Sequence, residues 1–78
     1  MDEYIINYNG FNYKINVCEN TDGTLILVIL DPSSYFGAVV NYMPCGDIRY
    51  DYEILLNNEM DETTIDNILE QFNTMVVR

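Results

Sequence analysis

The chain of 78 residues has no histidine, no tryptophan and only three basic side chains, Lys14, Arg49 and Arg78. Without histidine it lacks the side chain that most often carries general acid–base catalysis near neutral pH. It has two cysteines, whose spacing fits neither a zinc site nor a disulfide framework. No glycine-rich phosphate loop is present. We therefore expect a protein that is not an enzyme and that holds no metal and no cofactor.

Cys18 and Cys45 are expected to be buried or semi-buried thiols in a reducing compartment, because activated thiolates need a positive surrounding that this chain does not offer. The longest apolar run, residues 25–30, is far shorter than a membrane span. No secretory signal precedes the first predicted strand. These absences predict a cytoplasmic protein without a membrane partner.

Acidic residues are abundant: thirteen carboxylates give a formal net charge of −10. A net charge of magnitude about 2–8 already keeps a small domain soluble. The excess creates a negative field that attracts basic partners and repels nucleic acid and anionic membranes. We therefore predict a basic protein as the partner, with no direct contact to nucleic acid.

Turn signals divide residues 1–78, which we interpret as a single domain, into short strands. Asn9-Gly10 predicts a tight hairpin between strands at about 3–8 and 11–18. Further strands are predicted at about 24–30, 35–43 and 48–55, with Gly37 at a bulge. Alternation in the last strand places Tyr50 and Tyr52 on the core face, opposite Asp51 and Glu53.

The end of the chain changes to a helical period, with a helix predicted at about 62–76. Ile65, Ile68, Leu69, Phe72 and Val76 form one apolar stripe, and Asp61 or Thr63 is the predicted N-cap. The fold class is α+β: a four- or five-stranded antiparallel meander with one C-terminal helix packed on the sheet.

Residues 25–30 are apolar at every position, so both faces of that strand require cover. One helix shields one face of a sheet. We predict that Ile26, Val28 and Leu30 form an oligomer interface, with a homodimer as its simplest form. A curled half-barrel that buries the strand within one subunit is the alternative.

The carboxylates concentrate in the second half of the chain, where residues 47–70 hold eight of them against Arg49. Within the predicted helix, three lie four residues apart and stack along one side. We call these three, Glu62, Asp66 and Glu70, the helix ladder. The predicted partner-binding residues, here termed the acidic pole, are the helix ladder together with Asp51, Glu53, Glu59 and Asp61.

These features predict a small acidic inhibitory protein that blocks a basic nucleic-acid-binding surface of a nuclease or defence complex. This is nucleic-acid mimicry of the anti-CRISPR or anti-restriction type. Coding rich in A and T, and the small size, favour a phage or mobile element as the source and the host cytoplasm as the location. Two alternatives remain open: a homodimeric interaction module with a solubilising acidic surface, and an antitoxin or immunity protein against a basic toxin.

Overall fold

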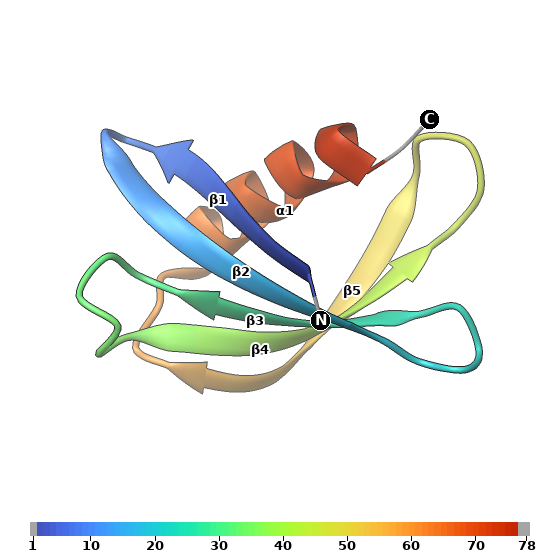
Figure 1. Ribbon diagram of the computed structural model, residues 1–78, viewed down its shortest axis with the longest axis horizontal. Coiled ribbons are helices and arrows are strands. Elements are labelled where there is room, and N and C mark those ends of the chain that lie inside the picture. Colours follow the sequence, from blue (N-terminus) through green and yellow to red (C-terminus); the bar gives the residue numbers. More distant parts are fainter. Residues whose placement is uncertain (1, 77–78) are drawn as a thin grey trace.

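The computed structural model describes residues 2–76 and shows one antiparallel sheet with one helix (Figure 1). The elements are β1 (Asp2–Tyr8), β2 (Phe11–Glu19), β3 (Leu25–Leu30), β4 (Gly37–Pro44), β5 (Tyr50–Asn58) and α1 (Glu62–Val76). The strands pair in chain order, so β1 and β5 form the two edges of the sheet. The predicted α+β meander with a C-terminal helix is confirmed.

The first hairpin turns at Asn9-Gly10, as the sequence predicts. Both residues have positive φ angles, 53° and 80°, which a type I′ turn requires. Tyr8 pairs directly with Phe11 across the turn. This register places Tyr4, Ile6 and Tyr8 on the same face as the alternating aromatic and aliphatic side chains of β2.

The core lies between α1 and one face of the sheet. The apolar stripe of the helix is completely buried at Ile65, Ile68, Leu69 and Phe72. We call the sheet face beneath it the covered face. The buried sheet residues of this core are Ile6, Ile15, Val17, Leu27, Ile29, Ala38, Val40 and Tyr42.

The helix has 15 residues and begins where the sequence predicts. The backbone N–H of Ile65 donates to the carbonyl oxygen of Asp61 at 3.1 Å, which makes Asp61 the residue that opens the helix. No helix within residues 2–76 is long and apolar enough to cross a membrane.

The opposite face of the sheet, which we call the open face, carries no second layer among the described residues. Ile26, Val28 and Leu30 point to it and are partly buried, whereas Leu27 and Ile29, on the covered face, are completely buried. Towards the sheet edges the apolar side chains become exposed, 52% for Ile5 and 65% for Leu56. The apolar residues of the open face are Ile5, Ile26, Val28, Leu30, Val39, Met43 and Leu56.

The sheet irregularity lies between β4 and β5, and the prediction of a bulge at Gly37 is wrong. Val39 pairs with Leu56 and Val40 with Ile54, which leaves Leu55 as the extra residue of β5. Gly37 instead begins β4 in regular pairing with Leu30. A Cβ atom on Gly37 would lie 2.5 Å from the carbonyl oxygen of Ile29, so this position needs glycine for close backbone approach.

Both cysteines are exposed, so the prediction of buried or semi-buried thiols is wrong. Cys18 lies near the end of β2, directly opposite Ile26 on the open face. Cys45 lies in the turn between β4 and β5. Their positions at strand ends, where the core has tapered off, explain the exposure.

We expect Gly37→Ala to lower the free energy of unfolding by about 1–3 kcal/mol, because the added methyl group overlaps backbone that cannot move without breaking the β3–β4 pairing. Equilibrium unfolding in urea measures this change. An unchanged unfolding midpoint would show that the two strands can separate locally at no cost.

Candidate functional site

The helix ladder lies along one exposed side of α1. Glu62, Asp66 and Glu70 are all exposed, while the residues of the adjoining apolar stripe are buried. Successive members rise about 6 Å along the helix axis. The helix thus presents three carboxylates to solvent from a backbone that the core holds in place.

Tyr52 on β5 connects the ladder to the sheet. Its hydroxyl group donates a hydrogen bond to Oδ1 of Asp66. This bond, together with partial burial and the negative charge of Asp66, raises the pKa of Tyr52 to about 12. The hydroxyl therefore remains a protonated donor at any physiological pH, and it orients the middle carboxylate of the ladder.

Tyr50 lies beside Tyr52 under the same side of the helix. The two rings stack with centroids 6.4 Å apart, and Tyr50 also stacks on Tyr42 at 5.3 Å. Burial raises the pKa of Tyr50, and the negative charges of Glu70 and Asp66 raise it further. Both tyrosines are partly buried against the core, in keeping with the predicted core face.

Asn73 anchors the C-terminal half of the helix through two polar contacts. It is the one buried polar residue among residues 2–76. Its Oδ1 accepts a hydrogen bond from the hydroxyl group of Tyr42, and its Nδ2 donates to the carbonyl oxygen of Ile48 at 2.8 Å. Sequence reasoning missed this residue, although an asparagine four positions after Leu69, within the apolar stripe, was a usable signal.

Glu59 and Asp61 lie in the connection between β5 and α1. With Asp31 they line a small hollow of about 140 Å³ beside Met60. Asn57 holds this connection, because its Nδ2 donates to the carbonyl oxygen of Met60 and its Oδ1 accepts from the Met60 N–H, both at 2.9 Å. Within residues 2–76 no group of three metal-ligating side chains is placed to hold an ion.

Asp51 and Glu53 lie on β5 next to the ladder, but their side chains point to the open face. Asp51 pairs with Met43, and Glu53 pairs with Asn41. The acidic pole is therefore divided by the β5 edge, with the helix ladder on one side of the sheet and these two carboxylates on the other.

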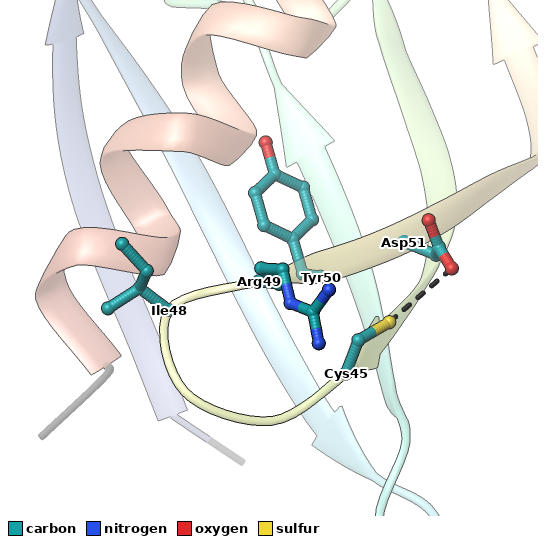
Figure 2. A pocket seen from close by; sticks show the side chains of 5 residues that line it. All are labelled: Cys45, Ile48, Arg49, Tyr50 and Asp51. Atoms are coloured by element: carbon teal, nitrogen blue, oxygen red, sulfur yellow. Dashed lines mark hydrogen bonds between the residues drawn. The ribbon is translucent and has the colours of Figure 1, made fainter.

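A surface hollow of about 370 Å³ lies at the start of β5, lined by Cys45, Ile48, Arg49, Tyr50 and Asp51 (Figure 2). The thiol of Cys45 donates to Oδ2 of Asp51 at 3.4 Å. This hydrogen bond is the largest of the effects that raise the pKa of Cys45. The cysteine is consequently a protonated thiol at neutral pH, which disfavours nucleophilic chemistry at this hollow.

Comparisons of this chain with models of known protein families, with characterised proteins and with solved structures give no significant match. The interpretation of the acidic pole therefore depends on its geometry and charge alone.

We expect Tyr52→Phe to remove one late-titrating tyrosine. The folded state favours the neutral form of the Tyr52 phenol, because its pKa is about 12 there and about 10 in the unfolded chain. Tyr52 therefore adds its full contribution to the free energy of unfolding below about pH 10, and this contribution is lost as the pH rises through about 12. Ultraviolet absorbance titration of the folded protein measures this step. Tyr35→Phe, at a loop position that is 79% exposed, is the control and should leave the late step in place.

We expect Asn73→Leu to lower the free energy of unfolding by about 1–3 kcal/mol, because the buried hydroxyl group of Tyr42 then loses its partner. Adding Tyr42→Phe should recover part of the loss. Asn67→Leu, on the same helix but in a hydrogen bond at the exposed surface, is the matched control, with an effect within about 0.5 kcal/mol. Equal losses from both single variants would contradict the anchoring role.

Proposed function

We propose that this protein is a small acidic inhibitor that binds a basic, nucleic-acid-binding surface of another protein and blocks it. The partner is a nuclease or a defence complex, and a phage or mobile element is the proposed source. The helix ladder is the central contact. Glu59 and Asp61 flank it in the connection before the helix, and Asp51 and Glu53 lie across the β5 edge, on the other side of the sheet.

The observation that carries this proposal is that the ladder has no cationic partner within the described residues. One ion pair is present in residues 2–76, between Lys14 and Glu3 at 3.9 Å, on the opposite edge of the sheet. The last turn of α1 contains no basic residue. Within residues 2–76, the carboxylates of the ladder thus remain available to the cations of a partner.

Stability alone does not account for this arrangement. Like charges four residues apart on a helix destabilise it by a few tenths of a kcal/mol for each pair. Glu62 lies in the first turn, where the helix dipole offsets that cost, whereas Glu70 lies beyond it. A lysine among the three would have strengthened the helix, so its absence supports a role in binding.

Arginine and lysine side chains that ordinarily bind phosphate groups would form charge-assisted hydrogen bonds with the ladder. The Tyr52 hydroxyl orients Asp66 before the partner binds. This preorganisation lowers the loss of side-chain conformational entropy on binding. Such an interface associates rapidly and weakens as salt is raised. An immunity protein that neutralises a basic toxin would use the same contacts, and a neighbouring gene for a basic nuclease would favour that form.

Charge reversal of the ladder tests the proposal. The double variant Asp66→Lys/Glu70→Lys should bind a susceptible nuclease or DNA-cleaving complex at least about tenfold more weakly. It should lose inhibition of DNA cleavage in parallel. Binding measured at low and high salt, together with cleavage assays on a panel of purified enzymes, gives the readout.

The control is Asp2→Lys/Glu19→Lys, which makes the same change in net charge on the β1–β2 side of the molecule. Both control residues are exposed. If the two double variants weaken binding equally, the effect is one of net charge, and the ladder is not the contact.

A further inference from the structure

The open face carries an apolar row that crosses three strands. Val28 on β3 pairs with Val39 on β4, which pairs with Leu56 on β5. Ile26 and Leu30 flank Val28 along β3. Val28 and Val39 are partly buried and Leu56 is 65% exposed, and contiguous apolar surface that solvent reaches marks interaction sites on soluble proteins.

The two flanks of this row differ in charge. On the β1–β2 side, Lys14 is already paired with Glu3. On the β5 side, Glu53 has no cationic partner within residues 2–76, and Asp51 accepts a hydrogen bond from the Cys45 thiol. The β5 side of the apolar row therefore carries a carboxylate without a cationic partner in residues 2–76, whereas the lysine on the other side is paired.

Asn41 lies at the boundary between the apolar row and this acidic border. It is the cross-strand neighbour of Ile26 on one side and of Glu53 on the other. Its Oδ1 atom is buried and accepts no hydrogen bond from residues 2–76. Buried acceptors are nearly always paired in native proteins, with ordered water among the usual donors, so Asn41 marks a polar position beside the apolar row.

A second copy of the chain fits this face poorly. The cations near it are Lys14, which is paired with Glu3, and Arg49, which lines the same hollow as Asp51. Two copies packed face to face would each bring a net charge of −10, so like charge opposes their association. A partner with its own basic side chains meets the charge requirement.

We infer that the open face binds a basic amphipathic segment of the partner. Its apolar side chains cover Val28, Val39 and Leu56, and a lysine or arginine along its β5 side bonds the exposed carboxylate of Glu53. The basic character of the partner is taken from the proposed function. The apolar row and the carboxylate of Glu53 are separate observations on a different side of the sheet.

A synthetic peptide provides the probe: a fluorescein-labelled helical peptide of leucine and lysine, with all leucines on one face. Leu56→Lys should weaken its binding by about tenfold in fluorescence anisotropy, because an apolar contact is replaced by a like charge. Glu53→Gln should weaken binding in the same direction.

Amide chemical shifts should change along β3, β4 and β5 at the residues of the open face. A second peptide, with glutamine in place of leucine, should bind more weakly and lose its remaining affinity in high salt.

Ile48→Lys is the matched control, since Ile48 is 73% exposed in a turn away from the apolar row. It makes the same chemical change and should alter peptide affinity by less than about twofold. Equal effects of Leu56→Lys and Ile48→Lys would overturn the inference. So would a wild-type dimer in sedimentation equilibrium that Leu56→Lys dissociates, because the occupant would then be a second copy.

The ladder variant Asp66→Lys/Glu70→Lys separates this inference from the proposed function. If it abolishes peptide binding while Leu56→Lys does not, the open face is not the docking surface and the proposed function stands. If Leu56→Lys alone weakens binding, the open face is supported and the ladder is removed from the interface. If neither variant changes peptide binding, the open-face inference fails, and the proposed function is decided separately by the ladder variant in the nuclease assays.

Discussion

One helix covers one face of a five-stranded sheet, and the rest of the structure depends on that constraint. Apolar burial is worth about 25 cal/mol per Å² of surface removed from water, so the face beneath α1 supplies most of the stabilising free energy. Ile15, Leu27 and Ile29 show this directly, because each is fully buried beneath the helix. The open face also carries aliphatic side chains, but among the described residues these are shielded from solvent only by the side chains beside them.

In the proposed function, the same helix serves both stability and recognition. Its apolar stripe closes the core, and the adjoining side carries the helix ladder. Asn73 and Tyr42 hold the C-terminal half of the helix to the sheet, and Tyr52 bonds to Asp66 further towards its N-terminus. The spacing of the carboxylates is consequently set by packing within the core. An acidic surface built in this way needs little reordering when a cationic partner binds, in contrast to an acidic tail.

Much of the architecture follows from local signals in the sequence. Asn9-Gly10 specifies its turn, and alternation within the strands identifies the face that the helix covers. The helical period together with Asp61 predicts α1 at its observed bounds. The extra residue at Leu55 and the glycine requirement at Gly37 were not predictable, because each depends on the distance between adjacent strands. Exposure of the cysteines depends equally on where the core ends.

The candidate site was predictable in its residues but not in its arrangement. Alternation already placed Asp51 and Glu53 opposite Tyr50 and Tyr52. Since the tyrosines lie beneath the helix, the two carboxylates lie on the far side of the sheet from the ladder. The bond between Tyr52 and Asp66 joins residues from different elements. It depends on how the helix is oriented about its own axis relative to β5, and no local sequence pattern encodes that orientation. Asn41 becomes notable only when its surroundings are known.

Because each strand pairs with the next one in the chain, the sheet can begin to form during synthesis on the ribosome. Each hairpin closes a short loop, so pairing can start as soon as a strand leaves the exit tunnel. The element that seals the hydrophobic interior, however, is the last of the described elements to be synthesised. Until residues 62–76 emerge, both faces of the nascent sheet are exposed to water, and repulsion between its carboxylates opposes premature self-association.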